Sequence, residues 1–352
     1  MIYDVAVVGA GPGGATCAAF CAEAGLSTLL IERSIFPREK VCGDCVNPAC
    51  WPIFERLQIV DRLQTLPHSR IAEVEFIGAN GRSARHPLPA FTHGEIAIKR
   101  SLLDHLLRQR ARELGALVRE GATVTALENG WNIQTTDGAF SARTLVAADG
   151  RNSTVARLLG LLPAAEKDRI GVQTHFPGPP DFGDRVVMRF LPRGYCGLAS
   201  VGDGQLNLCL VSRPAHIGEI KAWAAREFSL PVEQDWRTIT PLARAPVAAA
   251  HPNLLLVGDA ARVVEPFTGE GIFYALASGE LAARHIAARD LDGYARAHAQ
   301  LYRGRLWINQ LAKQAVLHPR LASVALRFPS VLRLLTAKVI RPAKEPAPSG
   351  RK

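Results

Sequence analysis

The chain begins with IYDVAVVGAGPGG at residues 2–14, an apolar run that leads directly into a loop of closely spaced glycines. The run Ile2–Val8 predicts a buried parallel strand, because valine and isoleucine dominate it. Gly9 permits the tight turn after that strand, Gly11 lets the backbone approach a pyrophosphate, and Gly14 lets the next helix pack closely. The stretch therefore predicts a strand–helix unit that binds a dinucleotide.

The residues that follow complete this unit. A helix is expected at about Ala15–Ala24, with its N–H groups and positive dipole end directed at the phosphates. Gly25 ends the helix, and Leu29–Ile31 is the next strand. Glu32 closes that strand about 20 residues after the loop, where an acid accepts hydrogen bonds from ribose hydroxyls. An acid here disfavours a 2′-phosphate, so NADP is not expected in this site.

Two further motifs lie far along the chain. The first reads ADGRNS at residues 148–153. The second reads LLLVGDA at residues 254–260 and continues into PFTGEGI at residues 266–272. One glycine loop alone is a weak signal, but three motifs in this order point to a flavoprotein that holds FAD along the length of its fold.

The last motif also has a chemical interpretation. Gly269 and Gly271 lie where the chain enters a helix, so their N–H groups would stabilise negative charge on the N1–C2=O edge of a flavin. Glu270 is expected to turn away from the ring, because an anion beside the flavin would oppose its reduction.

The remaining segments predict an α/β fold in which a strand-rich part interrupts the nucleotide-binding parts. Helices are expected at Pro52–Leu63, Ser101–Leu114, Ile217–Phe228 and Gly271–Arg289. Strands are expected in a hairpin at Val74–Pro87, in a meander at Ala122–Ala148, through Gly171–Leu242, and at Leu254–Val257.

These segments divide into a Rossmann-type FAD-binding domain and an inserted β-rich substrate domain. The FAD-binding domain is expected to be discontinuous, at residues 1–70, 95–165 and 245–310. The substrate domain is expected over the flavin ring, at residues 71–94 and 166–244. A C-terminal helical segment follows at residues 311–340, and the tail at residues 341–352 is expected to be disordered, because it is rich in Pro and Lys.

From about Tyr3 to Ala288, the chain resembles the flavoprotein superfamily that includes p-hydroxybenzoate-type aromatic hydroxylases and geranylgeranyl reductases. Residues 149–157 resemble its second fingerprint, and Gly258-Asp259 resembles its third, whose aspartate holds the ribityl chain of FAD. Arg100 matches an arginine that reaches the FAD phosphates. The segment Cys42-Gly43 and the PFTGEGI motif are more similar to the geranylgeranyl reductase branch.

The motifs and the resemblance together give a set of candidate site residues. Those expected to bind FAD are Gly9, Gly11, Pro12, Gly13, Gly14, Glu32, Arg33, Arg100, Asp149, Gly258, Asp259, Pro266, Gly269, Gly271 and Ile272. Cys42 and Tyr195 are the candidate catalytic residues, because the resemblance implies that both lie beside the flavin ring.

The resemblance implies an FAD-dependent oxidoreductase that acts on a hydrophobic unsaturated small molecule, an isoprenoid or similar compound, and reduces a carbon–carbon double bond. NAD(P)H is the external electron donor that this chemistry would use. The branch commonly carries a Tyr-x-Trp-x-Phe-Pro stretch, whereas Arg193–Ser200 keeps Tyr195 and lacks the other elements. Two alternatives therefore stay open: a monooxygenase that hydroxylates an aromatic or polyketide-like ring, and a flavin-binding sensor without turnover.

Charge and cysteine content bear on partners. The net charge is +10, but the basic residues are spread out and form no nucleic-acid recognition motif. The segment Leu317–Arg341 interleaves basic and apolar residues, which favours peripheral membrane contact. No long apolar run and no leader is apparent, so we expect a cytoplasmic protein, at or near the inner face of the membrane. Cys42 and Cys45 are spaced C-x2-C, but suitable further ligands are missing, so no metal is predicted.

Overall fold

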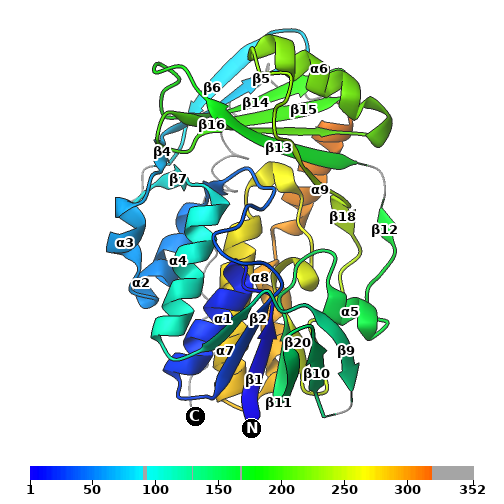
Figure 1. Cartoon of the computed structure of the whole chain (residues 1–352). Coiled ribbons are helices and arrows are strands. Elements are labelled where there is room, and N and C mark those ends of the chain that lie inside the picture. Colours follow the sequence, from blue (N-terminus) through cyan, green and yellow to red (C-terminus); the bar gives the residue numbers. More distant parts are fainter. Residues whose placement is uncertain (90–92, 129, 167–168, 319–352) are drawn as a thin grey trace.

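The computed structural model describes residues 1–89, 93–128, 130–166 and 169–318 (Figure 1). A largely parallel sheet with its helices forms one half of the molecule, and a second sheet lies across the end of the first half (Figure 1). The predicted α/β class, with a largely parallel sheet and helices in the C-terminal part, is confirmed.

The first sheet is built around the N-terminal strand. Strand β1 (Ile2–Val8) lies between β2 (Thr28–Glu32) and β11 (Gly138–Ala147), and all three run parallel. The sheet continues through β8 (Leu117–Glu120) on one side and through β20 (Leu254–Leu256) and β19 (Ala250–His251) on the other. Strands β9 (Val124–Glu128) and β10 (Asn132–Thr135) form the predicted meander with β11.

Helices cover this sheet. They are α1 (Pro12–Glu23), α4 (Arg100–Glu113), α7 (Gly271–Ala287) and α8 (Leu291–Leu301). Helices α1 and α7 run side by side (Figure 1). They approach closely enough that a Cβ atom on Gly279 would lie 2.2 Å from the carbonyl oxygen of Gly13. This contact holds the middle of α7 against the first turn of α1, although the two are far apart in sequence.

The second sheet has the order β17-β13-β16-β15-β14-β5-β6. Its strands are β5 (Glu73–Ile77), β6 (Ser83–Pro87), β13 (Ile170–Pro177), β14 (Arg185–Leu191), β15 (Gly194–Ser200), β16 (Gln205–Ser212) and β17 (Arg237–Ile239). Helix α6 (Ile217–Glu227) packs Ile220 and Ala224 against one face of it. The predicted hairpin appears as β5 and β6.

Smaller elements join the two halves. Strand β7 (Glu95–Ala97) pairs with both β3 (Cys45–Val46) and β4 (Ser69–Ile71). Strand β12 (Ala165–Glu166) pairs with β18 (Ala243–Arg244). Helix α5 (Thr154–Leu158) follows β11, and helix α9 (Leu306–Leu317) lies next to the second sheet.

The single helix predicted at Pro52–Leu63 is wrong. Helix α2 (Trp51–Arg56) ends where Gln58 adopts a φ of 54°, and α3 (Val60–Thr65) follows. The N–H of Ile59 closes the first helix by donating to the carbonyl of Phe54, as in a Schellman motif. The break lets Leu57 and Ile59 both enter the core, where each is at most 1% exposed.

The predicted amphipathic basic segment at Leu317–Arg341 and the predicted disordered tail lie outside the described residues, apart from Leu317, the last residue of α9, and His318. Within the described ranges, no helix combines the length and apolar character that crossing a bilayer would require.

We expect Gly279→Ala to destabilise the fold, because its Cβ would press on the backbone of Gly13 at the α1–α7 contact. Overpacking of this kind costs about 1–3 kcal/mol of unfolding free energy, which denaturant titration measures. Gly218→Ala on α6 is the matched control, because nothing lies within 4 Å of its Cβ position. Equal unfolding free energies for the two variants would contradict the prediction.

Candidate functional site

One cavity of about 650 Å³ lies between the two halves of the molecule. All three sequence motifs border it, at residues 8–13, 148–152 and 257–272. It continues past the loop at residues 38–45 to strands β14, β15 and β16 of the second sheet and to helix α9. The cavity therefore extends from the edge of the first sheet, where the three motifs lie, to the face of the second sheet.

The glycines around this cavity fall into two groups. Gly14 is required by packing, because a Cβ atom there would lie 1.8 Å from the carbonyl oxygen of Gly9. Gly11 is open, since the atom nearest to its Cβ position is an arginine nitrogen at 3.6 Å. At Gly269 and Gly271 nothing lies within 4 Å. These three open glycines border the cavity, so a ligand can approach their backbone closely.

Glu32 is buried at the end of β2 and borders the cavity. Its Oε2 accepts from the N–H of Ala10 at 2.8 Å, and its Oε1 accepts from the N–H of Ser34 at 2.9 Å. Each carboxylate oxygen can accept a further hydrogen bond. The side chain is thus held in place where a ribose hydroxyl would need an acceptor.

Cations gather near the glycine loop: Arg38, Lys40, Arg100 and Arg151 all border the cavity. Arg100 donates from Nε and Nη2 to the two oxygens of Asp104, at 2.7 Å each, and Arg38 Nη1 lies 3.1 Å from the same carboxylate. Burial, followed by repulsion from Arg100, Arg38 and Arg151, lowers the pKa of Lys40 to about 8. Cations crowded to this degree favour an anionic ligand such as a pyrophosphate.

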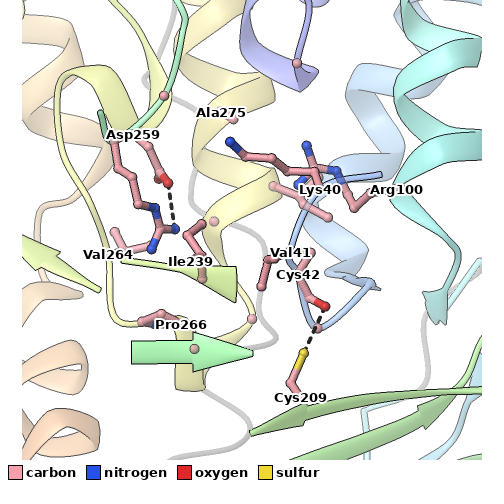
Figure 2. A pocket seen from close by; sticks show the side chains of 18 of the residues that line it. Lys40, Val41, Cys42, Arg100, Cys209, Ile239, Asp259, Val264, Pro266 and Ala275 are labelled. Atoms are coloured by element: carbon pink, nitrogen blue, oxygen red, sulfur yellow. Dashed lines mark hydrogen bonds and ion pairs between the residues drawn. The ribbon is translucent and has the colours of Figure 1, made fainter. Parts of the chain in front are cut away.

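Two aspartates from the later motifs complete this end of the cavity. Asp149 Oδ2 accepts from two N–H groups at the start of α5, at 2.6 and 3.2 Å. Its Oδ1 is buried without a hydrogen-bond partner among the described residues, and burial raises its pKa. Asp259 Oδ2 accepts from Arg151 Nη2 at 2.9 Å. Figure 2 shows Asp259 across the space from Lys40 and Arg100.

These features fit FAD. Open glycine backbone and the cations suit its pyrophosphate, and the carboxylates of Glu32, Asp149 and Asp259 suit its hydroxyl groups.

The loop after the cations is tied to the second sheet by buried side chains. Asp44 is fully buried and has a φ of 59°. His175 Nε2 lies 2.7 Å from Asp44 Oδ2, and Gln173 Nε2 donates to the same oxygen at 3.3 Å. Both partners come from β13, more than a hundred residues away in sequence. The contact therefore fixes the loop against the sheet that forms the far wall of the cavity.

The same attachment holds Cys42 by its backbone. Its N–H donates to Gln173 Oε1 at 3.3 Å, and its carbonyl accepts from Asn207 Nδ2 at 2.9 Å. The Cys209 thiol also donates to this carbonyl, at 3.0 Å (Figure 2). Cys42 and Cys209 both border the cavity. A thiol is thus presented at the junction of the two walls.

Charges of both signs act on the Cys42 thiol. Burial raises its pKa, the Arg100 guanidinium lowers it, and the Asp44 carboxylate raises it. Asp44 itself has a pKa raised by burial and lowered by His175 and Arg100. The pKa of the Cys42 thiol therefore responds to a cation on α4 and to an anion on its own loop.

The far end of the cavity is apolar and aromatic. The ring of Phe267 packs edge-on against Tyr195 with 5.3 Å between centroids, and it stacks with Phe190 at 5.7 Å and Phe76 at 6.5 Å. Burial raises the pKa of Tyr195 well above its ordinary value, so its hydroxyl stays protonated. This end suits an uncharged, lipophilic ligand.

The structure brings nearly all of the predicted site residues to this one cavity. Its wall includes Gly9, Gly11, Pro12, Gly13, Glu32, Arg33, Arg100, Asp149, Gly258, Asp259, Pro266, Gly269, Gly271 and Ile272, together with Cys42 and Tyr195. Gly14 lies behind the loop, where it packs on Gly9. Glu270 is buried and paired with Arg305, away from the cavity wall, as expected.

Sequence reasoning missed several residues that shape the site. Lys40 and Arg151 add positive charge at the end of the cavity near the glycine loop. Their position as basic residues close to a recognised motif could have predicted this role. Asp44, His175 and Cys209 carried no comparable signal, because their partners lie on distant strands.

Comparison with known proteins agrees with this site. The family model of the FAD binding domain matches residues 2–183, which is more than half of the chain. A menaquinone reductase of Mycolicibacterium smegmatis is 29% identical over 323 residues, which covers 84% of this chain and 78% of that protein. A digeranylgeranylglycerophospholipid reductase of Methanocella arvoryzae is 30% identical over 319 residues and covers 81% and 77%.

Solved structures share the fold. A flavin-dependent brominase superposes with a TM-score of 0.80 at 21% identity and covers 97% of this chain and 95% of its own. A geranylgeranyl bacteriochlorophyll reductase-like protein of Thermoplasma acidophilum has a TM-score of 0.72 at 24% identity and covers 98% and 94%. The resemblance drawn from the motifs is confirmed: the chain belongs to the FAD binding domain family and is an FAD-dependent oxidoreductase.

Proposed function

We propose that the protein reduces a carbon–carbon double bond in a lipophilic unsaturated small molecule, an isoprenoid or a similar compound. The observation that carries this proposal is the continuity of one cavity, which is cationic at the glycine loop and apolar and aromatic at the second sheet. A cofactor pyrophosphate suits the first end, and an uncharged substrate suits the second.

Each part of the wall has a task in this proposal. The open glycines, Lys40 and Arg100 hold the pyrophosphate, and Asp259 holds the ribityl chain. FAD, when bound and reduced, supplies the hydride. The aromatic cluster around Phe267 excludes water from the reacting end, and Cys42 and Tyr195 orient the substrate.

Two further parts of the proposal concern partners. NAD(P)H is the proposed external electron donor. Peripheral contact with a membrane at its inner face is also proposed, because the basic and apolar segment Leu317–Arg341 would suit it. That segment lies almost wholly outside the described residues.

Anaerobic turnover tests the reaction class. With NAD(P)H, a prenylated probe such as geranylgeranial and no oxygen, we expect reductant to be consumed and product mass to increase by one hydrogen molecule per double bond reduced. The variant Glu23→Ala, on the exposed end of α1, is the control for handling. Consumption that requires oxygen and adds an oxygen atom would indicate a monooxygenase, and consumption under neither condition would indicate a sensor.

Cofactor binding is tested by variants at two motifs. Glu32→Ala should weaken FAD binding by about 1–3 kcal/mol, because a charged acceptor is lost. Asp259→Ala should also reduce flavin content and leave Arg151 without its carboxylate partner. Flavin absorbance per chain after dialysis measures both, with Glu23→Ala as the matched control. Full flavin content and full activity in Asp259→Ala would remove this residue from the cofactor site.

The charges around Cys42 give a test in the resting protein. Asp44→Asn removes an anion that raises the pKa of the Cys42 thiol, so the midpoint of its reaction with iodoacetamide should shift to lower pH. Peptide mass spectrometry separates Cys42 from buried Cys196, which serves as the internal control. An unchanged midpoint with faster alkylation at every pH would mean that Asp44 acts only by holding the loop.

A further inference from the structure

A carboxyl group lies in the apolar part of the cavity. Glu95 is the first residue of β7, the strand between β3 and β4, and its side chain borders the cavity. The cavity residues of neighbouring elements in this part are largely apolar: Ile71, Val74, Leu88, Val186 and Ala199. Figure 1 shows β7 at the junction of the two halves, between α4 and the second sheet.

Glu95 differs from three other acids of the cavity wall. Asp259 pairs with an arginine, and Glu32 and Asp149 each accept two backbone N–H groups. In the described parts of the chain, no basic side chain and no backbone N–H pairs with the Glu95 carboxyl. The titratable groups whose pKa the Glu95 charge raises are the thiols of Cys45 and Cys50.

The protonation state of this carboxyl follows from its surroundings. Burial alone raises the pKa of Glu95 to about 8. At neutral pH the group is therefore mostly a neutral carboxylic acid, which has an O–H donor as well as acceptor capacity. The Glu95 side chain is partly buried and borders the cavity, so a ligand that supplies an acceptor can reach this O–H and pair with it.

The chemistry of that acceptor can be narrowed. The surrounding wall excludes strongly hydrated groups, so the acceptor must belong to a lipophilic molecule, and a carbonyl oxygen meets both conditions. A hydrogen bond to a conjugated carbonyl also draws electron density from the adjacent double bond, which makes that bond a better hydride acceptor.

We propose that Glu95, as a neutral acid, donates a hydrogen bond to the carbonyl oxygen of a lipophilic α,β-unsaturated carbonyl substrate, a quinone or an enone. This inference rests on the proposed reductase function and specifies its substrate class. Glu95 then determines substrate specificity, because a hydrocarbon of the same skeleton without the carbonyl oxygen leaves the acid without a hydrogen-bond partner.

The test compares two matched ligands on oxidised, FAD-loaded protein. 2,3-Dimethyl-1,4-naphthoquinone carries the carbonyl groups and has no ring position free to alkylate thiols, and 2,3-dimethylnaphthalene is the same ring system without oxygen. Equilibrium dialysis near neutral pH gives both affinities. Glu95→Leu should weaken the affinity for the quinone by about tenfold, the equivalent of one hydrogen bond. The affinity for the hydrocarbon should stay the same or increase.

Two further variants keep the result interpretable. Glu95→Gln retains a donor, so it should keep the quinone affinity and lose the weakening that the parent protein shows as pH rises through about 8. Leu88→Ala changes the volume of the same wall without a polar group, so it should shift both ligands together.

The outcomes separate this inference from the proposed function. An equal loss of affinity for both ligands in Glu95→Leu would overturn the inference and would mean that Glu95 acts only by shaping the cavity wall. Affinity for a lipophilic amine such as decylamine that rises with pH and exceeds that for the quinone would overturn it in favour of a cation. Flavin content and anaerobic turnover, measured on the same samples, report on the reductase function independently of either result.

Discussion

Close contact between two backbones is the constraint on which the cavity depends. Helix α7 can reach the loop after β1 only because Gly13 and Gly279 lack side chains, and Gly13 also lies close to the carbonyl of Ala275. The hydroxyl of Ser278 then accepts from the N–H of Gly258 at 2.8 Å, which fixes the third motif to the same helix. The three motifs thus meet at one edge of the first sheet, and the cofactor end of the cavity results from that meeting.

Local signals in the sequence were sufficient for this part of the molecule. The glycine spacing, the apolar strand before it and Glu32 after the second strand each predict a backbone conformation or a side-chain position without reference to distant residues. The break at Gln58 had no such signal, because the burial of Leu57 and Ile59 in the core decides it. The attachment of Asp44 to His175 joins residues 131 positions apart, and no spacing rule reaches that far.

Charge is distributed unevenly between the two ends of the cavity. Ion pairs with carboxylates explain how the cationic end tolerates so many neighbouring cations. Arg100 and Arg38 share Asp104, and Arg151 pairs with Asp259, so these guanidinium groups are compensated by carboxylates before any ligand arrives. Lys40 has no ion pair with a carboxylate in the described ranges, and burial, followed by repulsion from the neighbouring arginines, lowers its pKa to about 8. An arriving anion therefore meets cations that are already oriented, which reduces the entropy lost on binding.

The loop at residues 38–45 connects this charged end to the apolar end. It begins with Arg38 and Lys40, presents Cys42 through bonds to its own N–H and carbonyl, and ends in β3, which pairs with β7. Strand β7 carries Glu95. The loop at residues 38–45 therefore places the cations first, the Cys42 thiol next, and the strand that pairs with β7 last along the cavity. A displacement of the second sheet would act on this loop through Asp44 and would move Cys42 together with β3. The distance between the Cys42 thiol and the apolar end of the cavity therefore depends on the loop and on its hydrogen bonds to β13 and β16.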